Sequence, residues 1–173
     1  MRFSLTGSLI GPEDVGIIDY YITILGQVDD KGEAGFNKSI TDYWGRMLSY
    51  QLVAAEDGGP AYTFSSIADD DQFSSAKAPL PILVADSRAP DEMDTTLKSL
   101  LFEFNPWELG STDTGMNGFV PLKYTGSKFN EGEMPDDAKC IAGFDNVGYV
   151  MGTSSSLFNQ ILLYIKDDDE NRY

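Results

Sequence analysis

Two patterns of apolar residues meet within residues 142–163, joined by a hydroxyl-rich turn. An apolar run leads into Gly152-Thr153-Ser154-Ser155-Ser156, and apolar residues at helical spacing follow the turn. Their recurrence predicts an amphipathic helix with one buried face made by Leu157, Phe158, Ile161, Leu162 and Ile165. Thr153 or Ser154 suits the cap of that helix, because a hydroxyl accepts from the free N–H groups of a first helical turn.

The first third of the chain has the pattern of two helices. Helical spacing predicts one over about Pro12–Asp29, with a buried face of Val15, Ile18, Tyr21, Ile22, Leu25 and Val28. A second begins near Ser39, where Ser39 and Asp42 resemble a capping box, and it ends before Asp57-Gly58-Gly59-Pro60. Its predicted buried face is Ile40, Tyr43, Trp44, Met47, Leu48 and Leu52.

Short apolar runs then predict strands. Leu80–Ala85 and Leu100–Phe104 are continuous runs, a pattern typical of strands buried on both faces. Phe119–Tyr124 is a third strand candidate, followed by a turn at Asn130-Glu131-Gly132. Residues 61–78 are expected to form a short helix or turn. Helices alternating with short buried runs predict an α/β fold, and 173 residues amount to one domain or part of one.

The composition and charge of the chain exclude several classes of function. The chain has 42% hydrophobic residues and a net charge of −16, which indicates a folded chain with an acidic surface. Such a surface repels nucleic-acid phosphates, so we expect no nucleic-acid partner. The chain has no histidine, which excludes a Ser-His-Asp or Cys-His mechanism built from these residues and a histidine-ligated zinc site. We expect no cofactor and no metal.

Three residues are candidates for hydrolytic chemistry. Ser154 and Ser155 lie in a turn that resembles the Gly-x-Ser-x-Gly elbow of serine hydrolases, although Ser156 replaces the last glycine. Helix capping and packing are the favoured explanation of this turn, with the nucleophile as the alternative. Asp86 follows a predicted strand, where it could be the acid of a Ser-Asp dyad or an ordinary turn aspartate.

Several colinear segments carry a family resemblance. Residues 41–52, TDYWGRMLSYQL, resemble a segment of the fungal lysophospholipases (phospholipase B). The same family is indicated by the segments 58–63 (GGPAYT), 81–86 (PILVAD), 102–108 (FEFNPWE), 143–146 (GFDN) and 151–159 (MGTSSSLFN). The resemblance covers residues 34–160, and residues 1–33 form a lead-in that matches no part of the family. Residues 1–173 are thus identified as a partial lysophospholipase catalytic domain.

The resemblance implies a fold and a reaction. The fold would be part of the three-layer α/β/α catalytic domain of the cytosolic phospholipase and patatin-like superfamily. That family hydrolyses acyl ester bonds of lysophospholipids and phospholipids with a Ser-Asp dyad and no histidine. Its Gly-x-Ser-Gly-Gly elbow precedes the matched region and its Asp-Gly-Gly follows it, so no catalytic residue is carried over. The alternatives are an inactive paralogue that acts as a binding or interaction module, and an esterase using Ser154 or Ser155 with Asp86.

Partners and location follow from the same resemblance. We expect a phospholipid or lysophospholipid substrate, transient contact with a membrane or micelle surface, and a secreted or cell-surface location, although no signal-peptide pattern precedes Glu13. Asn37-Lys38-Ser39 is a glycosylation sequon. The single cysteine, Cys140, has no internal disulfide partner. The resemblance implies that it pairs with a cysteine outside this segment.

Overall fold

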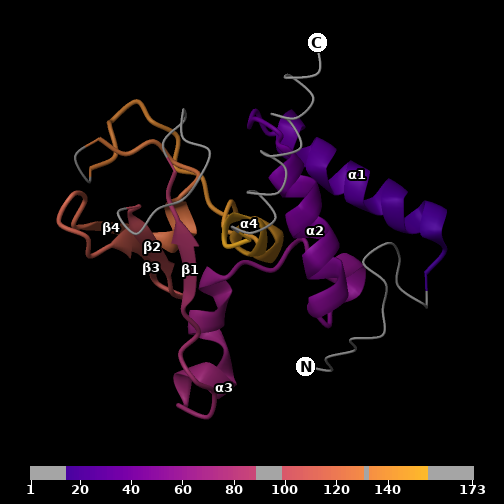
Figure 1. Cartoon of the computed structure of the whole chain (residues 1–173), viewed down its shortest axis with the longest axis horizontal. Coiled ribbons are helices and arrows are strands. Elements are labelled where there is room, and N and C mark those ends of the chain that lie inside the picture. Colours follow the sequence, from indigo (N-terminus) through magenta and orange to yellow (C-terminus); the bar gives the residue numbers. More distant parts are fainter. Residues whose placement is uncertain (1–14, 89–98, 131–132, 156–173) are drawn as a thin grey trace.

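A computed structural model describes residues 15–88, 99–130 and 133–155. Two helices, α1 (Ile17–Glu33) and α2 (Ile40–Leu52), are followed by the short helix α3 (Asp71–Ser74), four strands and helix α4 (Val147–Thr153). Figure 1 shows α4 between α2 on one side and the sheet on the other. Helix α4 therefore joins the helical and the sheet parts of the molecule. None of the described helices has the length and hydrophobicity of a membrane span.

Helix α1 forms where the spacing predicts, but it buries another face. Its buried residues are Tyr20, Ile24 and Val28, whereas Ile18 is 71% and Ile22 is 62% exposed. The predicted face was wrong, apart from Val28, because the helix carries two apolar stripes with the same period and spacing alone does not choose between them. The helix extends to Glu33, and its predicted start at Pro12 lies outside the described residues.

Helix α2 confirms the predicted start and end. Ser39 N–H donates to Asp42 Oδ2 at 2.7 Å, and the reciprocal bond of the capping box is present. The helix stops at Leu52, ahead of a turn in which Asp57, Gly58 and Gly59 have positive φ angles. An added Cβ atom at Gly58 would meet the backbone of Tyr50, so this turn requires glycine.

The most buried face of α2 is not its apolar one. Its buried residues are Gly45, Arg46 and Ser49, and Ile40 is exposed. This face packs on α4, which buries Gly148, Val150 and Gly152. A Cβ at Gly45 would collide with the Gly148 carbonyl oxygen, and one at Gly152 would lie 2.7 Å from the Thr41 carbonyl oxygen. The two backbones approach so closely that only small residues fit between them.

The strands form one antiparallel sheet in the order β1 (Leu83–Asp86), β2 (Leu101–Phe104), β3 (Glu108–Ser111) and β4 (Gly118–Pro121). Strands β1 and β2 were predicted; β4 begins where predicted and then turns into a 3₁₀ helix at Leu122–Tyr124. Strand β3 was missed because Leu109 is its only large apolar residue. Helices with a sheet confirm the α/β class.

One face of the sheet is buried and the other is open. Leu83, Phe104, Leu109 and Val120 are cross-strand partners on the inner face. The core there comprises Phe64, Ala85, Phe104, Leu122 and Val150. Val84 and Phe119 on the outer face are 43% and 40% exposed. The prediction that β1 and β2 are buried on both faces was therefore wrong for the described part of the chain.

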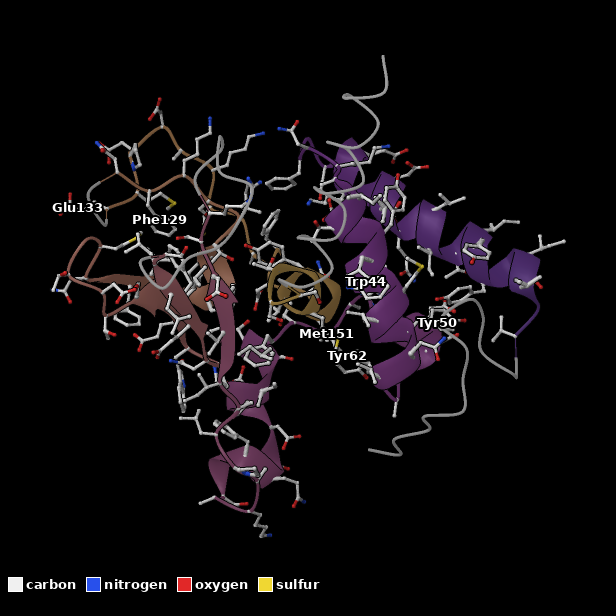
Figure 2. The ribbon with its side chains drawn as sticks, in the orientation of Figure 1. Trp44, Tyr50, Tyr62, Phe129, Glu133 and Met151 are labelled. Atoms are coloured by element: carbon white, nitrogen blue, oxygen red, sulfur yellow. The ribbon has the colours of Figure 1, made fainter. Side chains whose placement is uncertain are left out.

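Smaller predicted elements are also present. Residues 61–78 contain a 3₁₀ helix at Ser65–Asp69 and helix α3, as expected. Asn130 and Glu133 exchange backbone hydrogen bonds across the predicted turn, whose two central residues lie outside the described ones. Figure 2 shows Phe129 and Glu133 at the end of the molecule opposite α1.

Candidate functional site

The two candidate serines lie at the end of a helix rather than after a strand. The apolar run before them is α4, and Ser154 is its C-cap residue. Ser154 Oγ donates to the Val150 carbonyl at 3.0 Å, and Ser155 Oγ donates to the Met151 carbonyl at 2.7 Å. A nucleophile elbow needs a strand ahead of the serine. The described geometry instead engages both hydroxyls with backbone carbonyls. The helix predicted after the turn, over Leu157–Ile165, lies outside the described residues.

Asp86 and these serines do not form a dyad in this structure. Asp86 ends β1 opposite Leu101, and the Ser87 N–H continues the ladder by donating to the Leu100 carbonyl. Side chains alternate along a strand, so Asp86 shares the outer face with Val84. Helix α4 packs on the other face, where Val150 joins Ala85 in the core. The sheet therefore separates Asp86 from α4.

Two residues predicted for modification are accessible. Asn37 is exposed in the connection between α1 and α2, and Cys140 is an exposed free thiol. The Asn37 side chain is therefore accessible to a glycosylating enzyme, and the Cys140 thiol is accessible to a second thiol.

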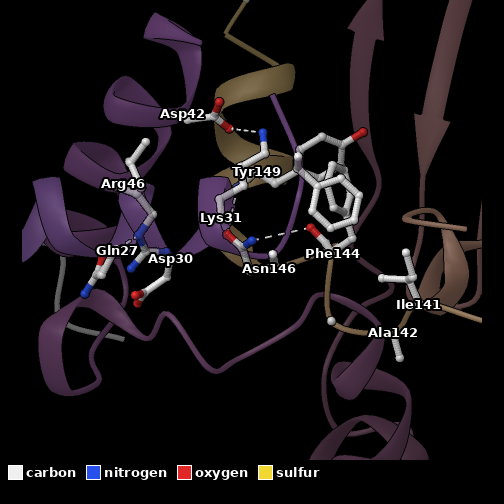
Figure 3. Close-up of a pocket in the computed structure, with 14 residues that line it drawn as sticks. Gln27, Asp30, Lys31, Asp42, Arg46, Ile141, Ala142, Phe144, Asn146 and Tyr149 are labelled. Carbon is white, nitrogen blue, oxygen red and sulfur yellow. Dashed lines mark hydrogen bonds and ion pairs between the residues drawn. The ribbon is translucent and has the colours of Figure 1, made fainter. Parts of the chain in front are cut away.

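A cavity of about 290 Å³ lies between the two N-terminal helices and residues 141–149. Figure 3 shows the charged side chains from α1 and α2 on one side and the rings of Phe144 and Tyr149 on the other. Charged residues that line it are Asp30, Lys31, Asp42 and Arg46. The lining thus combines aromatic surface with two positive and two negative side chains.

Arg46 is the most buried charge at this cavity. It is 6% exposed, its Nε donates to Gln27 Oε1 at 2.7 Å, and its Nη2 donates to the carbonyls of Asp57 and Gly58 at 3.3 and 3.4 Å. Burial lowers the pKa of Arg46 to about 10, while the charge of Asp57 opposes that shift. The side chain is therefore still protonated at neutral pH.

Lys31 forms an ion pair, whereas no carboxylate of the described residues lies within 4.0 Å of Arg46. Its Nζ lies 2.6 Å from Asp42 Oδ1 and 5.4 Å from the centre of the Phe144 ring. The Phe144 ring packs against both Phe36 and Tyr149, with centroid distances of 4.7 Å. Burial raises the pKa of the Tyr149 hydroxyl, and a hydrogen bond with Thr153 partly offsets this shift. These rings form an aromatic wall of the cavity.

Asp145 is a buried aspartate between the cavity residues Phe144 and Asn146. It is fully buried, its Oδ2 accepts from the Ser65 N–H at 2.9 Å, and its carbonyl accepts from the Phe64 N–H at 2.9 Å. Its Oδ1 has no hydrogen-bond partner among the described residues. Asp145 thus fixes the segment before α4 to the 3₁₀ helix that follows Phe64.

The sequence analysis missed the cavity residues Arg46, Lys31 and Asp30. A signal was present in the two small residues Gly45 and Ser49, which flank Arg46 at helical spacing and marked the face that is buried. The larger apolar residues of the predicted buried face outweighed this signal in the sequence.

Comparisons with known proteins assign the chain to a family. The lysophospholipase catalytic domain matches residues 4–173, a match that begins ahead of the resemblance found at residue 34. Lysophospholipase 1 of Aspergillus fumigatus is 52% identical over 160 residues, and the lysophospholipase of Penicillium chrysogenum is 50% identical over 160. Each alignment covers 90% of this chain. It covers 25% and 26% of those relatives, so the chain spans about a quarter of their length.

A solved structure supports the fold. Human GIVD cytosolic phospholipase A2 superposes with a TM-score of 0.64 at 18% identity, over 81% of this chain and 17% of that one. At this identity the likeness concerns the fold alone. From the match over nearly all of its residues, the chain belongs to the lysophospholipase catalytic domain family.

Proposed function

We propose that the complete protein hydrolyses acyl ester bonds of lysophospholipids and phospholipids, and that this chain supplies a non-catalytic segment of its catalytic domain. The observation that carries the proposal is the family match over residues 4–173, with relatives named lysophospholipases at 50–52% identity. The chain spans about a quarter of those relatives, which fits a segment.

The reaction needs a nucleophile, a base and an oxyanion site. In the chemistry that the family resemblance implies, a serine attacks the ester carbonyl, an aspartate accepts its proton, and backbone N–H groups stabilise the oxyanion. Ser154 and Ser155 bond to helix carbonyls, and Asp86 lies across the sheet from α4. We therefore place the dyad outside residues 1–173.

The finer parts of the proposal concern the setting of the protein. We include a secreted or cell-surface location, glycosylation of Asn37, a disulfide from Cys140 to a cysteine outside this segment, and transient contact with a membrane or micelle surface. The exposure of Asn37 and Cys140 supports the two modifications. Phospholipid breakdown would be the resulting role.

The test is fatty-acid release from lysophosphatidylcholine by the purified 173-residue chain, measured beside a full-length fungal relative. We expect release by the relative and none by the chain. Release by the chain that a serine-directed inhibitor abolishes would contradict the proposal, because it would place a nucleophile within these residues. Ser154→Ala and Ser155→Ala would then identify which serine acts.

A further inference from the structure

Helix α1 exposes a broad apolar stripe, called here the bare stripe. Its side chains are 39–71% exposed and follow one another over consecutive turns: Ile17, Ile18, Tyr21, Ile22 and Leu25. At 3.6 residues per turn these positions fall within about 140° of the helix circumference. An apolar stripe at least about 100° wide is typical of a helix face that packs on a core. The bare stripe therefore has the width of a buried face.

The neighbouring side of α1 is already packed. Tyr20, Ile24 and Val28 are at most 2% exposed, and the Tyr20 ring meets the Tyr50 ring of α2 edge to face, with centroids 5.0 Å apart. Figure 1 places α1 at the margin of the described part of the molecule, with α2 on its inner side. Apolar faces on two sides are expected of a helix that has packing partners on two sides. The described residues supply the partner for one of them.

Most of the catalytic domain of a relative lies outside the matched segment. Lysophospholipase 1 of Aspergillus fumigatus is matched over 25% of its length, so about three quarters of that protein lies beyond the match. The spacing of Ile18, Ile22 and Leu25 predicts a buried face, although the described residues leave it open. Both observations hold if the cover is polypeptide from the rest of the domain.

The charges of α1 disfavour a lipid surface as the cover. The helix carries four carboxylates and one lysine, Lys31, and the whole chain has a net charge of −16. Helices that lie in a membrane interface have polar faces rich in lysine and arginine, which attract anionic lipids. An acidic helix is repelled by such lipids instead.

A second copy of this chain also fits the bare stripe poorly. The stripe covers residues 17–25, about 12 Å of a helix 10–12 Å wide, so its outward half offers on the order of 300 Å². Stable interfaces between separate proteins bury roughly 800 Å² on each partner. A connected part of the same domain needs less area, because the covalent link removes much of the cost of association.

We propose that the bare stripe of α1 docks on an apolar face of the part of the lysophospholipase catalytic domain that lies outside these 173 residues. In the complete domain α1 is then an interior helix, covered by α2 on one side and by that apolar face on the other. The inference rests on the proposed function in one respect, that this chain is a segment of a larger catalytic domain.

The test compares two thiol probes, each in the 173-residue chain alone and in a chimera of Aspergillus fumigatus lysophospholipase 1 in which this chain replaces the matching segment. Ile22→Cys places a thiol in the bare stripe. Gly26→Cys is the control on the polar side of the same helix, where nothing lies within 4 Å of the Cβ position. Both probes fall in the tryptic peptide 3–31, apart from Cys140, so mass spectrometry after maleimide labelling reports their rates separately.

In the chain alone, both thiols should react at similar rates. In the chimera, shown to be folded by a cooperative thermal melt, Ile22→Cys should react at least about tenfold more slowly, while Gly26→Cys should change less than about twofold. Equal reactivity of the two thiols in the folded chimera would overturn the proposal. Protection of Ile22→Cys in the chain alone would overturn it too, in favour of a second copy if the protection rises with protein concentration. Protection of the chimera only with phosphatidylcholine vesicles would assign the stripe to a lipid surface.

A second measurement uses stability instead of a thiol. Ile18→Glu with Ile22→Glu should lower the soluble yield of the chimera several-fold and leave that of the chain alone undiminished. Thr23→Glu with Gly26→Glu adds the same charges on the polar side and should lower neither. Equal yields of the two chimera variants would contradict docking through the bare stripe. Fatty-acid release is measured separately, so a folded, inactive chimera with a protected Ile22→Cys would overturn the proposed function and leave this docking surface standing.

Discussion

Gly45 of α2 packs directly against the backbone carbonyl of Gly148 in α4, with no room for a Cβ atom between them. This contact brings the two helices together and places Arg46 beside the cavity. Gly152 repeats the arrangement one turn further along α4, against the backbone of Thr41. The close approach of α2 and α4 therefore organises both the core and the candidate site.

Gly45→Ala should destabilise the chain by about 1–3 kcal/mol, because the added methyl group forces the helices apart. Gly26→Ala is the matched control: Gly26 lies inside α1 with nothing within 4 Å of its Cβ position. The control should stabilise by about 0.5–1 kcal/mol through helix propensity. Urea denaturation measures both, and equal effects would contradict the packing account.

The two apolar stripes of α1 should respond oppositely to substitution. Ile24→Ala removes a buried side chain and should cost about 2–5 kcal/mol. Ile18→Glu combined with Ile22→Glu changes only exposed positions, so stability should stay within about 0.5 kcal/mol per site while solubility rises. Denaturant midpoints and the soluble fraction after centrifugation distinguish the stripes. A large loss of stability in the double variant would show that the exposed stripe is packed.

Tyr149 should make stability fall in alkaline solution. Burial raises its pKa in the folded chain above the ordinary value of 10.0, so the folded state holds the proton more tightly than the unfolded state. This contribution is fully present below pH 10.0 and is lost as the pH rises through the folded-state pKa. Tyr149→Phe should flatten the decline, as read from urea denaturation at several pH values. If the stability of Tyr149→Phe declined as steeply as that of the unchanged chain, groups other than Tyr149 would cause the alkaline loss of stability.

The capping box at Ser39 and Asp42 should hold the start of α2. Asp42 accepts from the Ser39 N–H and also pairs with Lys31, so Asp42→Ala should cost about 1–2 kcal/mol. Asp29→Ala removes the carboxylate of the exposed Lys38 pair and should cost no more than about 1 kcal/mol. Denaturation in low and high salt compares them. A larger loss for Asp29→Ala would contradict the assignment.

Local signals in the sequence were sufficient for the helix boundaries. The Ser39–Asp42 box and the turn at Asp57–Gly59 act over a few residues, and the structure has both. The buried face of α1 depends on where α2 lies, which period alone does not specify. Strand β3 exists because β2 and β4 pair with it on both sides, although its own sequence has little strand character.

The candidate site was less predictable for a similar reason. In the sequence Arg46 is an ordinary polar position on a helix, and only the packing of α4 on α2 buries it. The cavity also joins residues more than a hundred positions apart, such as Asp30 and Phe144. The family resemblance came from colinear segments and needed no tertiary information. The sequence pattern could not predict the role of charged residues whose burial depends on contacts between distant segments.

The most direct test of the central claim is a chimera of Aspergillus fumigatus lysophospholipase 1 in which this chain replaces the matching segment. If the chain is a working part of a lysophospholipase catalytic domain, the chimera should release fatty acid from lysophosphatidylcholine. It should still do so with Ser154→Ala and Ser155→Ala together, because the nucleophile comes from the relative. A folded, soluble chimera without activity would contradict the claim and favour an inactive binding module.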